Sequence, residues 1–231
     1  MEIRDLRSDA ELAGVEQLQR EVWGFSDLDV VSASIFRVML EIGGILVGAF
    51  DGSKLVAFNS GFAGYRHGRL EIHSDMLAVR EAYRDCGLGY TLKMAQRERT
   101  LAMGIKRITW TFDPLRSRNA YFNFRKLGAL SNEYRVNFYG ETTSSFLHST
   151  GTDRLWITWI LDRERVVSPC AGEVIEIPRD IDSLSNEEQW KWRISTRARF
   201  SELMADGYSV TDYDGNGRYT LQRGSLEDFI R

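Results

Sequence analysis

Hydrophobic residues recur along this chain with two different periods, one typical of helices and the other of strands. The N-terminal part is predicted to form two helices and then three strands. Ser8 or Asp9 can cap the first helix. A tight turn at residues 51–54 makes the first two strands a hairpin. These predicted elements are Asp9–Trp23, Val31–Glu41, Ile45–Asp51, Leu55–Phe62 and Leu70–Val79.

The next part of the chain alternates between helices and strands. The pattern predicts a helix, a strand, a helix that Ser117 or Asn119 can cap, and two more strands. Such an order after an initial hairpin predicts an α/β (α+β) fold, in which helices flank a central mixed sheet. These elements are Tyr90–Met103, Arg107–Phe112, a helix ending at Leu127, Leu130–Phe138 and Leu155–Leu161.

The C-terminal part resembles a separate, smaller unit. Residues 163–173 are charged and contain Ser168-Pro169, which is typical of a linker. Residues 174–231 are predicted to form a strand, a helix (Asn186–Ala205) and a hairpin. We therefore expect a main domain over residues 1–162, a linker, and a small α/β extension. The extension has little core of its own, so it should pack on the main domain or on a second subunit.

Composition narrows the classes of partner and the compartment. The 231 residues carry a net charge of −3, which does not favour nucleic acid as a partner. The two cysteines (Cys86 and Cys170), the absence of a signal-peptide pattern and the short apolar runs predict a cytoplasmic protein that does not enter a membrane. The histidines show no metal-ligand spacing, so no metal is expected.

The segment Arg84-Asp85-Cys86-Gly87-Leu88-Gly89 lies between a predicted strand and a predicted helix. Glycines allow a tight turn that directs several N–H groups into one space, and the helix N-terminus adds the positive end of its dipole. The segment thus predicts a cradle for a diphosphate. The alternative is an ordinary strand-to-helix turn with two glycines.

This segment resembles the acyl-CoA-binding motif of the GNAT superfamily of N-acetyltransferases, which reads Arg or Gln, two residues, Gly, one residue, then Gly or Ala. The segment 119–128, Asn-Ala-Tyr-Phe-Asn-Phe-Arg-Lys-Leu-Gly, resembles the second motif of that superfamily. Further similarity over residues 109–154 is to a subfamily of predicted GNAT acetyltransferases with a C-terminal extension. The resemblance covers roughly Met1–Asp162.

The resemblance implies a GNAT fold, acetyl-CoA or another acyl-CoA as cofactor, and a set of binding residues. Backbone N–H groups of the cradle and the Arg84 side chain would hold the diphosphate, while the edge of one strand would pair with the amides of pantetheine. Residues of the second motif would complete the site. The implied cofactor-binding residues are Leu77, Ala78, Val79, Arg84, Cys86, Gly87, Leu88, Gly89, Tyr90, Asn119, Phe122 and Phe124.

Candidate catalytic groups lie on the strand before the cradle. Glu71, His73 and Asp75 alternate, so a regular strand would direct all three to one face. One interpretation is a solvent-facing side of the strand. The other is a wall of the acceptor site, with His73 or Glu71 as the general base and Asp75 binding the amine.

Two further positions leave alternatives open. Many GNAT enzymes have a Tyr on the second-motif helix that protonates the leaving thiolate. By the resemblance, Phe124 occupies that position in this chain. Tyr121, three residues earlier, could take that role. Asp113, at the end of a strand, either faces a ligand crevice or caps the next helix.

The sequence therefore predicts an acyl-CoA-dependent N-acyltransferase that acts on a small-molecule amine by direct attack in a ternary complex. A non-catalytic acyl-CoA-binding or regulatory module is the alternative that Phe124 motivates. The extension could mediate a homodimer. Residues 212–217 resemble the start of a calcium loop, but Arg223 occupies the position where that loop needs Glu, which favours a hairpin turn.

Overall fold

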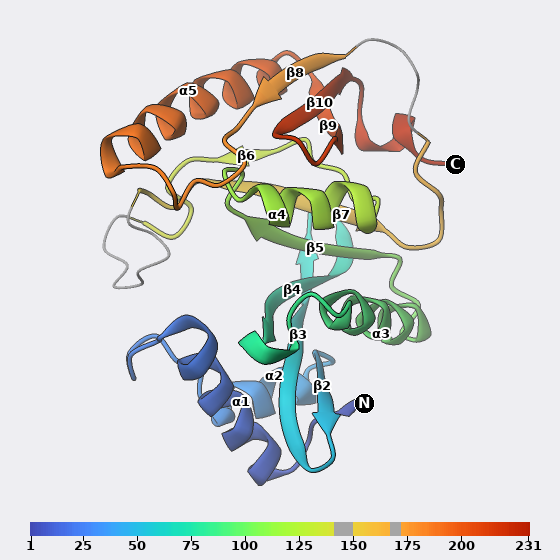
Figure 1. The fold of residues 1–231 in the computed structure, drawn as a ribbon. Coiled ribbons are helices and arrows are strands. Elements are labelled where there is room, and N and C mark those ends of the chain that lie inside the picture. Colours follow the sequence, from blue (N-terminus) through green and yellow to red (C-terminus); the bar gives the residue numbers. More distant parts are fainter. Residues whose placement is uncertain (141–149, 167–171) are drawn as a thin grey trace. The chain divides into compact units, whose positions relative to one another are not determined.

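A computed structural model describes residues 1–140, 150–166 and 172–231 of the chain (Figure 1). The described residues form two compact units, Met1–Thr109 and Trp110–Arg231. Strand β5 (Arg107–Phe112) runs from the first unit into the second. Part of the predicted linker 163–173, including Cys170, lies outside the described residues.

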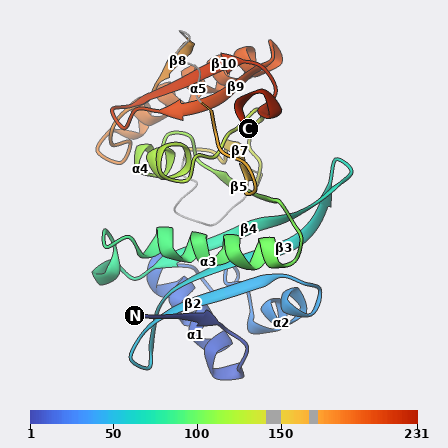
Figure 2. The ribbon, with the colours of Figure 1, turned by 90° about the vertical axis from the view of Figure 1, so that its right-hand side faces the viewer.

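The first unit is a sheet with helices on both faces. Its strand order is β1-β2-β3-β4-β5, and neighbours are antiparallel except β4 and β5, which are parallel. Figure 2 shows α3 along one face of the sheet and α1 and α2 on the other. The elements are β1 (Glu2–Asp5), α1 (Asp9–Trp23), α2 (Ala33–Glu41), β2 (Ile45–Asp51), β3 (Lys54–Arg66), β4 (Arg69–Val79), the short 3₁₀ helix η1 (Glu81–Tyr83) and α3 (Leu88–Ala102).

Local sequence explains where α1 begins and ends. The Ser8 hydroxyl accepts from the N–H of Glu11, and the Glu11 carboxylate accepts from the N–H of Ser8, so the two form a capping box. Gly24, at φ +66°, ends the helix in the left-handed conformation. The apolar face of α1 then packs with α2 and the sheet, in a core that includes Leu12, Phe36 and Phe58.

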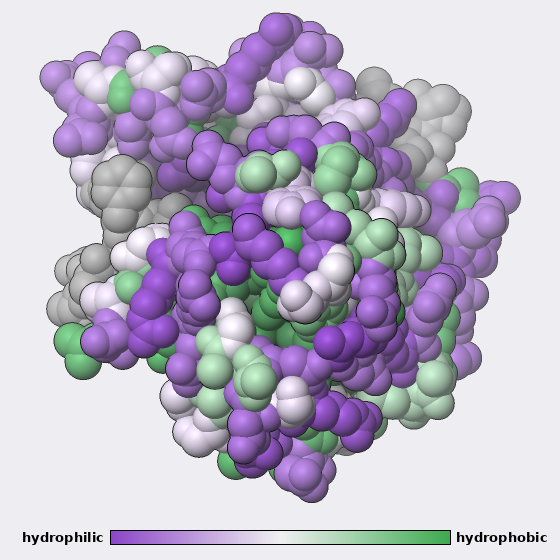
Figure 3. Space-filling model, turned by 60° about the horizontal axis from the view of Figure 1, so that its bottom comes forward, coloured by the Kyte–Doolittle hydropathy of each residue, from purple (hydrophilic) through white to green (hydrophobic). Residues whose placement is uncertain are grey.

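Several elements of this unit differ from the prediction: β3 extends to Arg66 rather than ending at Phe62, and α3 begins at Leu88 rather than at Tyr90. The four-residue edge strand β1 was not predicted, because it is short and half of its residues are exposed and polar; its pairing with β2 defines it. Helix α2 begins at Ala33 rather than at Val31, after the N-cap residue Ser32. On α2, the side chains of Ile35 and Val38 are exposed, and so is that of Ile42, directly after the helix. Figure 3, in which the bottom of the view of Figure 1 comes forward, shows apolar groups scattered among hydrophilic ones.

The second unit contains the last strands of the seven-stranded sheet and a separate three-stranded sheet. Strand β5 continues the order β5-β7-β6, and a separate sheet has the order β8-β10-β9. The predicted hairpin of the extension is confirmed as β9 and β10. The elements are α4 (Ser117–Ala120), the π-helical stretch η2 (Tyr121–Lys126), β6 (Tyr134–Arg135), β7 (Arg154–Ile160), β8 (Glu173–Glu176), α5 (Asn186–Ala205), β9 (Tyr208–Tyr213), β10 (Arg218–Arg223) and the 3₁₀ helix η4 (Leu226–Phe229).

Two predictions for the second unit were wrong. Ser117 and Asn119 do not cap the helix; they lie inside α4, whose N-cap residue is Arg116, and the Ser117 hydroxyl instead bonds to the Tyr213 hydroxyl at 2.6 Å. The predicted strand Leu130–Phe138 shrinks to β6. Its first residues divide their pairing between two strands, Leu130 with Thr158 and Ser131 with Val210, so no continuous ladder forms.

The calcium-like segment is a hairpin turn, as predicted. The Asp214 carboxylate accepts from the backbone N–H groups of Asn216 (2.6 Å) and Arg218 (3.1 Å), so backbone donors of the turn engage it. Among the described residues, no group of three or more His, Cys, Asp or Glu side chains could hold a metal ion. No helix of the described ranges has both the length and the apolarity needed to cross a bilayer.

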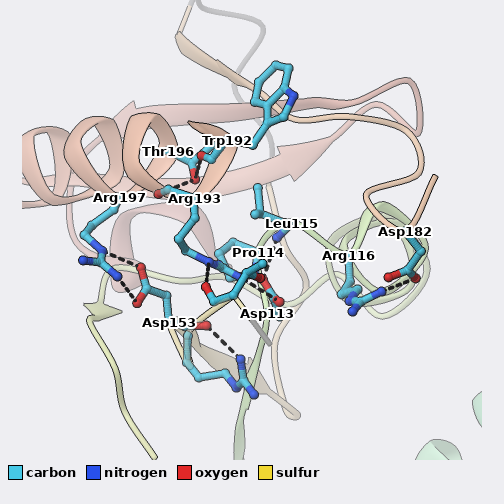
Figure 4. A network of polar contacts seen from close by, with 12 residues as sticks. Asp113, Pro114, Leu115, Arg116, Asp153, Asp182, Trp192, Arg193, Thr196 and Arg197 are labelled. Atoms are coloured by element: carbon cyan, nitrogen blue, oxygen red, sulfur yellow. Dashed lines mark hydrogen bonds and ion pairs between the residues drawn. The ribbon is translucent and has the colours of Figure 1, made fainter. Parts of the chain in front are cut away.

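Two ion pairs attach α5 to the rest of the second unit (Figure 4). Arg193 is fully buried and its Nη2 donates to Asp113 at 2.7 Å, while Arg197 donates twice to Asp153, at 2.8 and 2.9 Å. Asp113 also accepts from the N–H of Leu115 at 3.0 Å. Asp113 therefore does not cap α4, whose N-cap residue is Arg116; its carboxylate is engaged by Leu115 and Arg193.

Candidate active site

The cradle segment forms an exposed turn that ends where α3 begins. Gly87, at φ +82°, is the N-cap residue of α3, and Asp85 is also left-handed at φ +64°. Glycine has no side chain that could cap the helix, so the first N–H groups of α3 are directed to the outside without a side-chain acceptor from the N-cap. An anion with several oxygens is the natural partner of such groups.

Contacts within the segment fix its shape. Arg84 Nε donates to the Val79 carbonyl at 3.2 Å and Cys86 Sγ to the Tyr83 carbonyl at 2.9 Å, which ties the turn to the end of β4. A Cβ on Gly87 would meet no atom within 4 Å, whereas one on Gly89 would lie 3.7 Å from Leu77 Cδ2. The turn is therefore open on the side of Gly87 and closed against β4 at Gly89.

The strand edge predicted to bind pantetheine belongs to the last part of β4. Leu77, Ala78 and Val79 pair with β3 on one side. On the other side, the parallel ladder with β5 comprises the pairs Ile72–Ile108 and His73–Thr109. Residues 77–79 therefore lie beyond that ladder, as a strand edge must if it is to pair with amide groups of a ligand.

A β-bulge interrupts β4 at Asp75. On β3, Gly61 pairs with Ser74 and the preceding residue, Ser60, pairs with Met76, so Asp75 is the extra residue. Before the bulge, Ser74 faces α3, where it accepts a hydrogen bond from Lys93; after it, Leu77 faces α3 and Met76 faces the core with α1. The bulge thus reverses which face of the sheet each side chain occupies.

Glu71 and His73 are joined through a residue that the sequence did not single out. The Thr109 hydroxyl lies 2.9 Å from Glu71 Oε1 and 3.1 Å from His73 Nδ1. Glu71 and Thr109 are buried, with exposed fractions of 4% and 1%, and His73 is half-buried. The interpretation of this strand face as solvent-facing is therefore wrong at Glu71. Thr109 could not be found from spacing, because only the β4–β5 register brings it here.

A buried lysine lies behind the bulge. Lys93 of α3 is only 3% exposed and donates to the Ser74 hydroxyl at 2.7 Å and to Gln96 Oε1 at 3.5 Å. Gln96 in turn donates to the Ser60 carbonyl at 3.3 Å, next to the bulge on β3. Burial lowers the pKa of Lys93 from 10.5 to about 7. A lysine in an amphipathic helix gives no sequence signal of this position.

The imidazole of His73 is uncharged at neutral pH. Burial lowers its pKa from 6.5 to about 4, with further contributions from the positive charges of Lys93 and Arg66. Asp75, the bulge residue, is exposed as a whole, but protein atoms around its carboxyl raise its pKa. The three residues of β4 that were predicted as catalytic therefore lie in three environments: Glu71 is buried, His73 is half-buried and neutral, and Asp75 is at the surface.

The residues of the second motif belong to the second unit. Asn119 and Tyr121 are exposed, Phe122 is half-buried, and Phe124 is fully buried. The Phe124 ring packs edge-on against Phe112 and Tyr219, with centroid distances of 6.1 and 5.7 Å. Phe124 thus has a packing role in the core of the second unit, and the roles predicted for the other three residues stay predictions.

Comparison with known proteins agrees with this fold. The family model described as "Acetyltransferase (GNAT) family" matches residues 5–129. No curated protein sequence matches the chain. Several solved acetyltransferase structures are similar in fold.

Three of these structures are acetyltransferases with different names and similar degrees of likeness to this chain. An aminoglycoside 6'-N-acetyltransferase complexed with coenzyme A is 17% identical, with a TM-score of 0.54, over 74% of this chain and 100% of that one. A putative acetyltransferase, yncA, from Salmonella typhimurium with its cofactor acetyl-CoA is 14% identical (TM-score 0.56; 74% and 99% covered). The ribosomal-protein-S18-alanine N-acetyltransferase from Escherichia coli is 17% identical (TM-score 0.53; 73% and 97% covered). At these identities the likeness establishes the fold.

The family match defines the class of this protein. The family match covers more than half of the chain, and the chain belongs to the GNAT acetyltransferase family. The predicted family and the predicted fold class are thereby confirmed, and acyl transfer from coenzyme A is the chemistry of this family. The acceptor is a separate question.

Proposed function

We propose that this protein is an acyl-CoA-dependent N-acyltransferase that transfers an acetyl group to the amine of a small-molecule acceptor by direct attack in a ternary complex. When bound, an acyl-CoA supplies an activated acyl carbon and a thiolate leaving group. The residues of the cradle fit its diphosphate, because the N-terminus of α3 has no side-chain cap and a Cβ at Gly87 would meet only open space. We assign the domain 1–162 to this activity.

Transfer to an amine requires the amine to be neutral. An ammonium acceptor gives one proton to a base of the protein, its nitrogen forms a bond with the acyl carbon, and the carbon–sulfur bond breaks. The second proton of the nitrogen ends on the released sulfur, and the first passes from the base to solvent. The chain therefore needs a base that is unprotonated at neutral pH.

The observation that carries the proposal is the place of the half-buried His73 on the same strand as the edge 77–79. The two are separated by the bulge, so a proton acceptor and the proposed pantetheine edge lie on consecutive parts of β4. Asp75 is the exposed carboxylate at that point and is proposed to attract the amine. Tyr121 stays the proposed acid for the thiolate, and catalysis is otherwise mostly positioning.

A non-catalytic acyl-CoA-binding module is the second candidate. Phe124 occupies the position at which many enzymes of the family have a Tyr. Its ring has no proton to donate and packs in the core of the second unit. Such a module would bind acyl-CoA at the same site as the proposed enzyme, but it would not transfer the acyl group. Release of free thiol from acetyl-CoA that depends on an added amine would exclude it.

The first experiment is calorimetric titration of the full chain with acetyl-CoA, longer acyl-CoAs and CoA, for the wild type and Gly87→Glu. The new carboxylate would stand in the cradle and repel the diphosphate. We expect wild-type binding and a loss of affinity of at least about tenfold in the variant. Wild-type binding then justifies a screen of amines for thiol release.

Gly104→Glu is the matched control. Gly104 is also left-handed, at φ +75°, and a Cβ there also meets no atom within 4 Å, so the two variants share the same backbone strain. Gly104 lies just beyond the C-terminal end of α3, and a helix of this length is about 22 Å long, so the control is far from the cradle. Equal losses in both variants, or no binding of any CoA by the wild type, would contradict the proposed cofactor site.

A further inference from the structure

Thr109 links Glu71 and His73 through its hydroxyl group. Its position follows from the parallel pairing of β4 with β5, in which His73 is directly opposite Thr109. Its hydroxyl lies within hydrogen-bond distance of both side chains, 2.9 Å from Glu71 Oε1 and 3.1 Å from His73 Nδ1. Thr109 is almost completely buried, so water does not take over this link.

A count of hydrogens determines which groups donate. A threonine hydroxyl has one hydrogen and can also accept. Since it donates that hydrogen to the Glu71 carboxylate, it can only accept from His73. The hydrogen between Thr109 and His73 is therefore on Nδ1. A neutral imidazole carries one N–H, so its lone pair for accepting a proton is on Nε2.

We propose that Thr109 is a positioning residue that holds His73 in the Nδ1–H form, so that Nε2 takes the proton from the acceptor amine. This inference rests on the proposed function. The proton moves from the ammonium nitrogen to Nε2, directly or through one water, and the imidazolium then formed donates through Nδ1 to Thr109. Glu71, at the other end of the link, holds the Thr109 hydroxyl in the orientation in which it accepts from Nδ1.

The same geometry separates the roles of Glu71 and His73. Glu71 is 4% exposed, and its Oε1 accepts from Thr109. A base must reach its substrate directly or through one water, and a half-buried His73 meets that condition better than a buried carboxylate. The general base is thus His73, and Glu71 acts on it through Thr109.

The test compares Thr109→Val with Thr109→Ser. Valine has nearly the same shape and no hydroxyl, while serine restores the hydroxyl, so the pair separates the hydrogen bond from the packing. Nitrogen NMR of the imidazole identifies the protonated ring nitrogen in the full chain without substrate. We expect the Nδ1–H form in the wild type and Thr109→Ser, and a shift toward Nε2–H in Thr109→Val.

Turnover supplies the second readout. In Thr109→Val we expect kcat to fall by about 100-fold, as for loss of base function, with the Kd for acetyl-CoA unchanged within about twofold. Thr109→Ser should regain most of kcat. Thermal unfolding of each variant confirms that the protein is folded before the rates are compared.

Three outcomes would overturn the proposal: an Nε2–H imidazole in the wild type, wild-type kcat in Thr109→Val, or an equal loss in Thr109→Val and Thr109→Ser. The NMR result does not depend on turnover. If the wild type binds no acyl-CoA, the proposed function fails, while the state of the His73 ring still reports on the hydrogen-bond arrangement by itself.

Discussion

At the scale of single residues, Lys93 is the most unusual feature of the first unit. Its ammonium group lies inside the protein, where it donates to Ser74 and Gln96. Its positive charge also helps to keep His73 unprotonated. The sequence predicted neither Lys93 nor Thr109, since both depend on contacts across elements, whereas the Ser8 cap and the cradle glycines were predicted from their immediate neighbours.

Lys93 makes stability depend on pH on the alkaline side. Its pKa is about 7 in the folded chain, against 10.5 ordinarily, so between these values the unfolded chain binds more protons than the folded one. The free energy of unfolding therefore rises with pH over this window, by an amount on the order of a few kcal/mol. Below pH 7 this contribution is lost, because the folded chain also takes up the proton at Lys93.

Urea unfolding of the wild type and Lys93→Met between pH 7 and 10.5 measures this effect. Methionine has a similar length and no charge, so the rise should be much weaker in the variant. Lys54→Met, at the exposed first position of β3, should follow the wild-type curve. A parallel rise in wild type and Lys93→Met would show that other groups cause it.

At the scale of elements, the close approach of α3 to the sheet depends on Gly61 next to the bulge. A Cβ on Gly61 would lie 2.7 Å from Gln96 Nε2, 2.8 Å from Ile72 Cγ2 and 3.2 Å from the His73 carbonyl. The predicted strands were correct here, but the bulge was not predicted, because it arises from the pairing of Ser60 and Gly61 with β4 and from the helix behind them. Glu71, His73 and Asp75 therefore do not share one regular face.

Gly61→Ala tests this packing. We expect it to lower the free energy of unfolding by about 1–3 kcal/mol, since the methyl group must displace α3 or its side chains. Gly64→Ala on the same strand is the control, because a Cβ there meets no atom within 4 Å. Denaturant unfolding compares the two, and equal stabilities would contradict the close packing at Gly61.

At the scale of the whole molecule, the C-terminal extension shares a core with residues that the sequence assigned to the main domain. The Tyr219 hydroxyl donates to the Pro114 carbonyl at 2.6 Å, its ring packs on Phe124, and Arg193 pairs with Asp113. The order of elements in the extension was predictable from its caps and turns. Its contacts were not, because nothing in a local pattern shows which distant residues a tyrosine or an arginine meets.

A chain that ends at Asp162 should therefore lose its cooperative unfolding. Truncation would leave Asp113 without Arg193 and would expose the rings of Phe112 and Phe124, so we expect a large loss of near-UV circular dichroism and a broad thermal transition. The full chain is the reference. A truncated chain that unfolds sharply and binds acetyl-CoA would support residues 1–162 as an independent domain.

The bulge at Asp75 has a consequence for how this strand can change in length. It lets one strand place Ser74 and Leu77 on the same face, although three positions separate them. Removal of a single residue at this point would restore simple alternation and turn one half of the strand inside out relative to the other. Most substitutions along β4 alter one contact, but a one-residue deletion here would exchange the core and the ligand-facing side chains together.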